Sequence, residues 1–309
     1  MPPFLIFSVT KQCNLNCKGC YAKHLHKDSG EELSIARIGE IIREAEHLGI
    51  SIVLLAGGEP LIRKDILTIT EQYPRMIFPI FTNGLLIDDA MARAFTRQKN
   101  AIPIVSLEGD LDLTDTRRGE GVYASITKTF EILRRCHAVF GTSITVTRDN
   151  FEEVTSLQFV EQLYQFGCRL VFFIEYIPCS DNSQKLVITP EQRSRLKQVL
   201  ADRRKQYDII FISFPGDEEA YGGCLAAGRG FVHISSSGRV EPCPFSPFSD
   251  ISLIDQTLAK ALKSHFLLKI RENRDLLSEH EGGCALWENR EWVKRTLVEG
   301  RDNKEADYT

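Results

Sequence analysis

The sequence predicts an α/β fold whose main body is an open, partial (β/α)6 TIM-like barrel. Short apolar runs typical of buried strands alternate with runs that carry apolar residues at helical spacing, and no hairpin turn separates consecutive strands before about residue 215. Such units form parallel sheets with right-handed crossovers. Six units are too few for a closed eight-unit barrel, so the sheet is expected to stay open.

The expected elements follow from local patterns. Six strands are expected at residues 4–9, 51–56, 76–81, 102–107, 139–147 and 169–177. Helices are expected from Ser34 to Gly49 and at residues 63–72, 88–97, 123–135, 151–166 and 189–205. Thr189 is expected to cap the last of these, with Pro190 at its first position.

The chain changes character from Gly222 onward. The strand–helix alternation stops, and residues 231–235 and 240–243 suggest a β-hairpin that turns at Ser237-Gly238. A helix is expected at residues 258–272, and the polar end after about Gly300 is expected to fray. We therefore divide the chain into a barrel, a small C-terminal α+β domain and a polar tail, at residues 1–215, 216–300 and 301–309.

Composition narrows the functional classes. The 309 residues carry a net charge of −4 and no long basic run, which argues against nucleic-acid binding; the small cluster Arg203-Arg204-Lys205 fits a solvated helix face. No apolar run reaches the ~20 residues that span a bilayer, and no secretory signal is present. We expect a cytoplasmic protein without membrane contact, in which nine cysteines favour metal binding or free thiols over disulfides.

Cys13, Cys17 and Cys20 stand within eight residues, directly after the first strand. Three thiolates leave one position open on a four-coordinate metal, whereas structural zinc takes four protein ligands. A [4Fe–4S] cluster with one iron free for a small molecule fits better. The alternatives are a zinc loop completed by His24 or His26, and three unrelated core cysteines.

The C-x3-C-x2-C spacing followed by Tyr21, with Gly57-Gly58-Glu59-Pro60 after the second strand, resembles the radical S-adenosylmethionine (SAM) superfamily. The resemblance implies a partial barrel with a [4Fe–4S] cluster on Cys13, Cys17 and Cys20. It also implies reductive cleavage of SAM to a 5′-deoxyadenosyl radical that abstracts hydrogen from a substrate. An electron donor such as flavodoxin or ferredoxin follows from this chemistry.

The same resemblance assigns cofactor-binding residues. Two glycines let the backbone of the GGEP segment approach the ligand and bond the methionine amine. The expected cofactor-binding residues are Tyr21, Gly57, Gly58, Glu59, Pro60, Thr82, Asn83, Ser106, Glu108 and Arg118. Tyr21 is expected at the adenine, Ser106 and Glu108 at the ribose or substrate, and Arg118 at the SAM carboxylate. A surface ion pair is the alternative for Arg118, and a simple turn for Thr82 and Asn83.

Cys224, Cys243 and Cys284 form a second set that resembles the SPASM and twitch extensions, which hold auxiliary iron–sulfur clusters. Trp287 stands where a fourth cysteine is expected, so the fourth iron is either open or bound by a group such as His280 or Glu281. The alternative is three buried structural cysteines. Cys179, at the site end of the sixth strand, is a candidate hydrogen-atom donor or cluster ligand, or else a passive loop thiol.

The leading hypothesis is thus a radical SAM enzyme with two iron–sulfur clusters. Its substrate is either a peptide or protein side chain or a small polar metabolite. Because the chain starts at the first strand, with no leader-recognition domain before it, we expect a small substrate or a peptide delivered by another protein. The alternative from a different class is a non-catalytic zinc or iron–sulfur binding protein, in which the GGEP segment would have no purpose.

Overall fold

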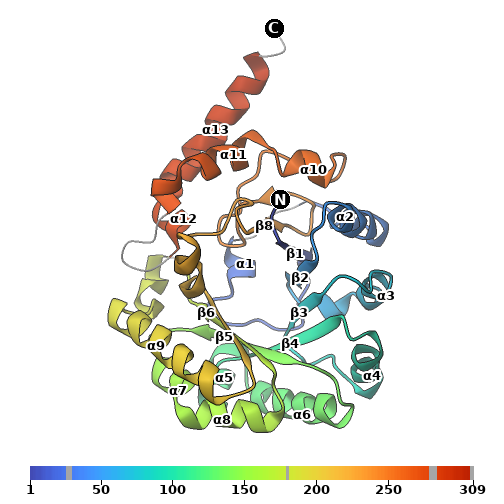
Figure 1. Ribbon diagram of the computed structural model, residues 1–309, viewed down its shortest axis with the longest axis vertical. Helices are drawn as coiled ribbons and strands as arrows, with labels where there is room; N and C mark the ends of the chain where they lie inside the picture. The colour runs from blue at the N-terminus through green and yellow to red at the C-terminus, as the bar shows by residue number, and fades with distance from the viewer. Residues whose placement is uncertain (26–29, 179–180, 278–283, 307–309) are drawn as a thin grey trace.

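The architecture is one continuous, curled sheet with helices outside it. The computed structural model describes residues 1–25, 30–178, 181–277 and 284–306. The strand order is β7-β6-β5-β4-β3-β2-β1-β8-β9. The strands are β1 (Phe4–Thr10), β2 (Ile52–Gly57), β3 (Phe78–Thr82), β4 (Ala101–Leu107), β5 (Gly141–Val146), β6 (Leu170–Glu175), β7 (Ile210–Phe214), β8 (Phe231–Ile234) and β9 (Val240–Glu241). The sheet curls into an open half-barrel (Figure 1), which confirms the predicted fold class.

All six predicted strands are present and pair in parallel, in chain order. Two further parallel strands extend the sheet at its edges. β7 joins β6 on one side, and β8 joins β1 on the other, with Phe4 opposite Phe231 and Phe7 opposite Ile234. β9 then returns antiparallel to β8. The predicted C-terminal hairpin exists, and it belongs to the same sheet as the barrel.

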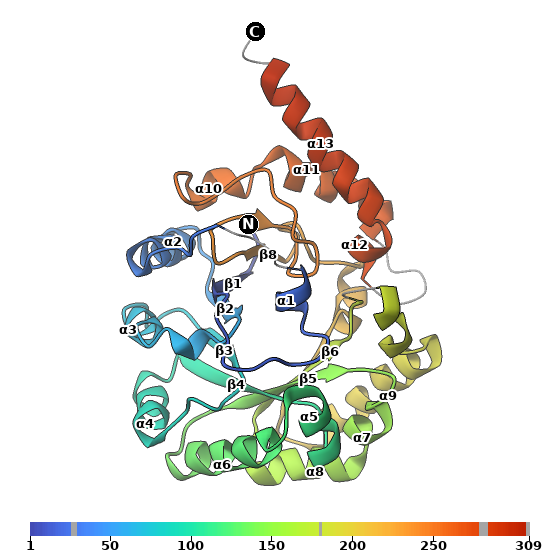
Figure 2. The ribbon, with the colours of Figure 1, turned by 180° about the vertical axis from the view of Figure 1, so that it is seen from behind.

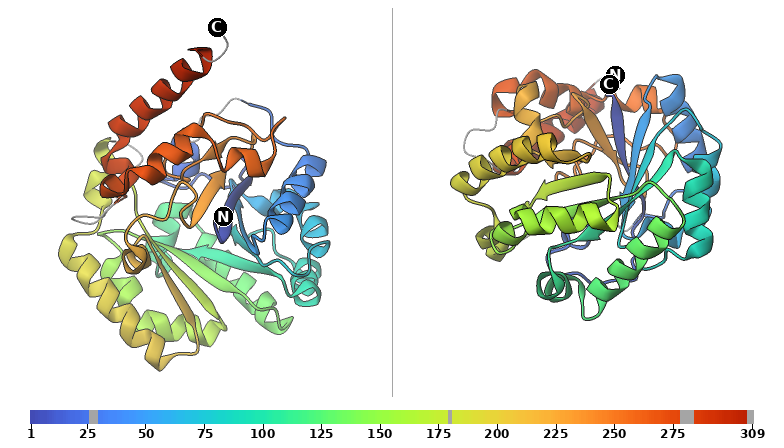
Figure 3. Two further views of the ribbon diagram at one scale, coloured as in Figure 1. Left: turned by 45° about the horizontal axis from the view of Figure 1, so that its top comes forward. Right: turned by 60° about the horizontal axis from the view of Figure 1, so that its bottom comes forward.

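The helices surround the sheet. They are α1 (Tyr21–Leu25), α2 (Ile35–His47), α3 (Ile66–Glu71), α4 (Asp89–Gln98), α5 (Leu111–Arg118), α6 (Val122–Arg135), α7 (Phe151–Thr155), α8 (Leu157–Phe166), α9 (Pro190–Gln206), α10 (Leu258–Ala261), α11 (His265–Glu272), α12 (Ala285–Glu288) and α13 (Arg290–Ala306). Short 3-10 helices are η1 (Pro60–Ile62), η2 (Asp181–Leu186), η3 (Gly216–Tyr221) and η4 (Arg274–Leu277). Figure 3 shows α10–α13 grouped beside the β8 edge, with α13 pointing away from the barrel.

Helix starts follow side-chain caps, and the predicted boundaries differ where a cap was missed. Thr189 caps α9 through a capping box with Gln192, as expected. Residues 151–166 form two helices because Ser156 is extended and its side chain accepts from the Phe159 N–H. Ser264 divides residues 258–272 in the same way. The chain was expected to fray after about Gly300, but α13 continues to Ala306, so this expectation is wrong for residues 300–306.

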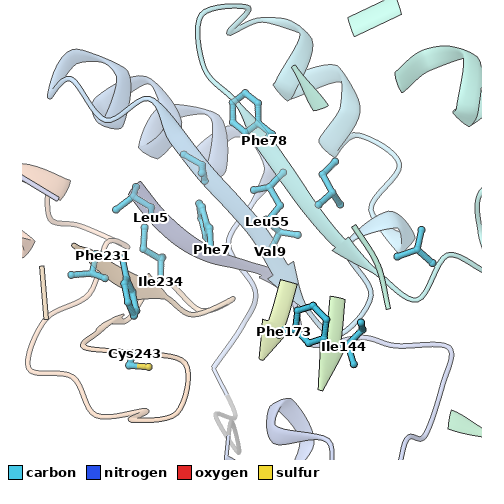
Figure 4. Close-up of a cluster of buried hydrophobic side chains, with 14 of the residues drawn as sticks. Leu5, Phe7, Val9, Leu55, Phe78, Ile144, Phe173, Phe231, Ile234 and Cys243 are labelled. Carbon is cyan, nitrogen blue, oxygen red and sulfur yellow. The ribbon is translucent and has the colours of Figure 1, made fainter. Parts of the chain in front are cut away.

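The core lies between the sheet and its helices. Phe7, Leu55, Phe78 and Phe173 are fully buried there, and Figure 4 shows them beside Leu5 and Val9 of β1. Burial of such side chains contributes about 1.5–3 kcal/mol each. This packing fixes the strands, so that the carboxyl ends of β1 to β6 are held at one end of the half-barrel. No helix of the described residues is both long and apolar enough to cross a bilayer.

Candidate functional site

A cavity of about 260 Å³ lies within the half-barrel and receives the segments that follow the strands. Both cysteine sets line it, Cys13, Cys17 and Cys20 from the loop after β1 and Cys224, Cys243 and Cys284 from the C-terminal region. Of the other predicted residues, Tyr21, Gly57, Gly58, Thr82, Asn83, Ser106 and Arg118 also line it. Parallel folds place their sites at this end of the strands, and the structure brings these residues together there.

The first cysteine loop, residues 11–20, crosses the interior of the half-barrel. Figure 2 shows it passing from the β2–β3 side to the β6 side before it enters α1. Asn83 donates to the Asn14 side chain over 2.7 Å, and the Lys18 N–H donates to the Arg117 carbonyl over 2.8 Å. Gly19, at φ +65°, faces the ring of Tyr176. The loop is thus held by elements after β3, β4 and β6.

The thiols of this loop share one electrostatic environment. Burial raises the pKa of the Cys17 thiol, the nearby Cys20 and Cys13 raise it further, and Arg118 and Arg117 lower it. Two guanidinium groups therefore favour the thiolate that a metal requires. Within the described residues, no three His, Cys, Asp or Glu side chains converge on the position of a single metal ion. His24 lies on α1, and His26 lies outside the described residues.

Gly57 and Gly58 lie against the backbone of residues 10–12, where a side chain would not fit. A Cβ at Gly58 would lie 2.1 Å from the Gln12 carbonyl oxygen, and one at Gly57 2.2 Å from that of Thr10. The Gly58 N–H donates to the Thr10 carbonyl over 2.8 Å, and the Glu59 N–H to the Gln12 carbonyl over 2.7 Å. From the sequence, these glycines are predicted to let the backbone approach SAM. The closest approach is instead to the backbone that leads into the cysteines, although both glycines also line the cavity.

Glu59 lies behind the cavity wall and is fully buried. Its carboxylate accepts from the Thr82 hydroxyl over 2.7 Å, the Asn83 N–H over 2.6 Å and the Leu61 N–H over 3.0 Å. Burial raises its pKa, and these hydrogen bonds together with Arg118 oppose the shift. Glu59 therefore positions the turn after β3. Pro60 opens η1 beside it and is also buried.

Glu108, at 2% side-chain exposure, is paired with two arginines. Arg118 donates through Nε over 2.9 Å, and Arg117 donates to the other carboxylate oxygen. Burial lowers the pKa of Arg117, but the charge and hydrogen bond of Glu108, together with Cys17 and Cys20, outweigh this and the pKa is raised. The sequence prediction named Arg118 and missed its neighbour Arg117. Ser106 lies 3.2 Å from Ser143.

The second cysteine set is more deeply buried than the first. Cys224, Cys243 and Cys284 are 5%, 7% and 9% exposed. Burial raises the pKa of the Cys243 thiol, and the adjacent Cys284 and Cys224 raise it further. The ring of Phe245, near Cys243, lies 5.0 Å from that of Tyr21, so the two cysteine regions meet at an aromatic pair.

Glu218 of η3 also belongs to this region and was missed in the sequence. It lines the cavity, and burial raises its pKa to about 7, while the Leu225 N–H and the Cys224 thiol lower it by hydrogen bonding. It lies six residues before Cys224 in a segment with no recognisable motif. Of the other predicted groups, Cys179, His280 and Glu281 lie outside the described residues, and Trp287 is on α12.

Comparison with known proteins places this geometry in a family. Residues 7–160 match the family model of the Radical SAM superfamily. The chain is 24% identical over 319 aligned residues to the AdoMet-dependent heme synthase of Methanosarcina barkeri, covering 93% of this chain and 88% of that protein. It is 26% identical to the GTP 3′,8-cyclase of Alkaliphilus oremlandii, covering 90% of this chain and 93% of that protein.

Solved structures agree at the level of the fold. Streptococcus suis SuiB bound to S-adenosylmethionine superposes with a TM-score of 0.74 at 20% identity, covering 92% of this chain and 73% of that one. The match to the Radical SAM family runs from β1 into α8. This part of the chain contains Cys13, Cys17 and Cys20 and the GGEP segment. The chain therefore carries a radical SAM superfamily domain, and it is a radical SAM enzyme.

Proposed function

We propose that this enzyme reductively cleaves SAM at a [4Fe–4S] cluster held by Cys13, Cys17 and Cys20, and that a second cluster held by Cys224, Cys243 and Cys284 faces the same cavity. The observation that carries the proposal is the placement of both cysteine sets around one space of about 260 Å³. The donor set fits, because thiolates are the usual ligands of such clusters. Ligands of a cluster bind separate irons, so they need not converge on one point.

The bound cluster and SAM would supply a 5′-deoxyadenosyl radical that abstracts hydrogen from the substrate. The chain's own residues hold and orient these groups. Gly57, Gly58 and Asn83 fix the cysteine loop from β2 and β3. Arg118 lies at the wall with its charge shared with Glu108, where it is available to a carboxylate of SAM. Ser106 and Tyr21 also line the space, and we assign them to the ribose and adenine.

The wall is otherwise largely apolar, with Ile6, Leu54, Phe81 and Phe214 among its members. Such a lining excludes water, which protects a reactive radical. We propose that the substrate belongs to one of two classes, a peptide or protein side chain or a small polar metabolite. Related proteins of both kinds are known: one similar structure is SuiB bound to precursor peptide SuiA, and one relative is a GTP 3′,8-cyclase.

A flavodoxin or ferredoxin would supply the electron for SAM cleavage, in a cytoplasmic setting. The auxiliary cluster would either accept the product electron or bind the substrate directly. Cys179, which follows β6 in the sequence, is proposed as a hydrogen-atom donor. A non-catalytic iron–sulfur protein is disfavoured by the cavity that joins the two cysteine regions.

The test is SAM cleavage by the anaerobically reconstituted, reduced protein, followed as 5′-deoxyadenosine and methionine. Replacing Cys13, Cys17 and Cys20 by Ala should abolish it. Replacing Cys224, Cys243 and Cys284 should leave some cleavage, uncoupled from substrate turnover. Cys136→Ala is the matched control, since Cys136 ends α6 away from the cavity. Unchanged cleavage in the first triple variant would disprove the assignment.

A further inference from the structure

We propose that the carboxylate of Glu218 is the fourth, non-cysteine ligand of the auxiliary cluster held by Cys224, Cys243 and Cys284. This inference rests on the proposed second cluster and completes its ligand set. It replaces the expectation of an open iron, or of ligation by His280 or Glu281, with a residue that the structure places at the site. Thiolates are the preferred iron ligands of such clusters, and a carboxylate is acceptable at one iron.

Glu218 is held in place by its own backbone and side chain. It is 5% exposed, its N–H donates to the Pro215 carbonyl over 2.7 Å, and its carbonyl accepts from the Gly223 N–H over 3.2 Å. One carboxylate oxygen accepts from the Leu225 N–H over 3.0 Å. The turn that leads from η3 to Cys224 is therefore closed around this side chain, and its head group is fixed beside the cysteine.

The carboxylate is in contact with the cysteine set. The Cys224 thiol donates a hydrogen bond to it, and it is near enough to Cys243 for its charge to act on that thiol. All four side chains line the same cavity. When iron replaces the proton of the Cys224 thiol, this hydrogen bond is lost, and the carboxylate needs another partner within the same cavity.

Two other buried carboxylates near the cavity, those of Glu108 and Glu175, form ion pairs with arginine. Glu108 is paired with Arg117 and Arg118, and Glu175 is paired with Arg193. Within the described part of the chain, no lysine or arginine forms an ion pair with Glu218. The charge of Arg229 lowers the pKa of Glu218, but its guanidinium donates to the carbonyls of Cys224, Tyr221 and Gly222.

A buried carboxylate without a cation is costly, since burial disfavours its charged form. The irons of a cluster supply positive charge at this position, so ligation accounts for the buried carboxylate of Glu218 in the cavity wall. Glu218 has a ligating oxygen in contact with one of the three cysteines, Cys224. Trp287, which stands at the expected fourth position, has no ligating atom.

The test isolates the auxiliary cluster in the full chain by replacing Cys13, Cys17 and Cys20 with Ala. This parent is reconstituted with ⁵⁷Fe and sulfide, and Mössbauer and EPR spectra are recorded. We expect four irons, one with the larger isomer shift of an oxygen-bound site. E218Q in this background should lose that site and convert to a [3Fe–4S] form several-fold faster under mild oxidation. E218C should restore a stable cluster with four thiolates.

Glu219 provides a matched control, because it is the next residue of η3 and its side chain is 65% exposed in an ion pair with Lys197. E219Q should behave as the parent. A parent without iron would overturn the second cluster and this inference together. A parent with a stable cluster whose spectrum and oxidation rate are unchanged in E218Q would overturn only the ligand assignment. Circular dichroism of each variant establishes that the chain remains folded.

Discussion

At the residue scale, the glycines and the glutamate of the GGEP segment act on neighbouring backbone. A Cβ at Gly58 would clash with the carbonyls of Lys11 and Gln12, and the Glu59 N–H donates to the second of these. The segment after β2 thereby sets the path of the chain into Cys13. The GGEP segment therefore affects the site by positioning the cysteine loop.

Gly58→Ala should therefore impair cluster assembly. Its Cβ would lie 2.1 Å from the Gln12 carbonyl oxygen, and backbone cannot yield as a side chain can, so the loop must shift. We expect a clear fall in iron bound per chain after reconstitution, together with weaker SAM binding. Gly39→Ala is the control, because nothing lies within 4 Å of a Cβ there and Ala favours helix α2 by about 1 kcal/mol. Full iron loading in Gly58→Ala would contradict this account.

Glu59→Ala should destabilise the protein even before any cofactor binds. It leaves the Thr82 hydroxyl and two buried N–H groups without their acceptor. Each such loss costs about 1–3 kcal/mol, so we expect a total of at least about 3 kcal/mol by urea unfolding of the apo-protein. Glu272→Ala, at an exposed i,i+3 pair on α11, should change stability by less than about 0.5 kcal/mol. Equal effects in the two variants would remove Glu59 from its positioning role.

At the element scale, a buried hydrogen-bond chain joins the C-terminal hairpin to the barrel. Ser8 of β1 lies 2.8 Å from His233 Nε2, and Glu241 of β9 lies 2.7 Å from Nδ1. Burial lowers the pKa of His233 to about 3, so the ring is neutral. A carboxylate only accepts, so Nδ1 donates to Glu241 and Nε2 accepts from the Ser8 hydroxyl.

Ser8→Ala should test this link. It removes the hydroxyl that donates to Nε2 of a fully buried ring, which we expect to cost about 1–3 kcal/mol in the free energy of unfolding. The measurement is urea unfolding at neutral pH. Ser51→Ala, at an exposed position before β2, is the control and should have little effect. A Ser8→Ala protein as stable as the control would show that β8 is held to β1 by backbone pairing alone.

Elements with a strong local pattern were predictable, and those set by tertiary contact were not. The apolar runs of β1 to β6 and the cap residues Ser34, Asp88 and Thr189 were sufficient to locate their elements. β7 was missed because its short run follows a charged helix without a turn signal. α5 was missed because it is short and mostly polar, and Thr114 is its one buried residue.

In the candidate site too, residues with a local sequence pattern were predictable, and residues that depend on tertiary contacts were not. Closely spaced cysteines and GGEP are visible in the sequence because their chemistry is local. Glu218 and Arg117 are not, because one becomes important only when η3 folds against Cys224 and the other only when α5 meets the cysteine loop. The role of Gly58 also depends on a neighbour that lies 46 positions earlier in the chain, at Gln12.

At the scale of the whole molecule, the barrel and the C-terminal region share a sheet. β8 supplies four paired positions along β1, from Phe4 to Phe7. The predicted boundary between residues 215 and 216 thus precedes a strand that covers the β1 edge. Open edges of this kind promote association between chains.

A chain that ends at Gly222 should therefore fold poorly. It exposes the edge of β1 and the apolar side chains that pack against Phe231 and Ile234, so we expect aggregation in size-exclusion chromatography with light scattering. The full chain under the same conditions is the comparison. A monodisperse, monomeric truncated protein with an unchanged unfolding midpoint would show that the barrel folds independently of β8.

The central claim is that two cysteine sets hold two clusters around one cavity. The most direct measurement is iron and acid-labile sulfide per chain after anaerobic reconstitution. We expect about eight irons in the full protein, because each of two clusters holds four. Either triple cysteine variant should hold about four, Cys136→Ala about eight, and the sixfold variant none. About four irons in the full protein, unchanged when Cys224, Cys243 and Cys284 are replaced, would contradict the claim.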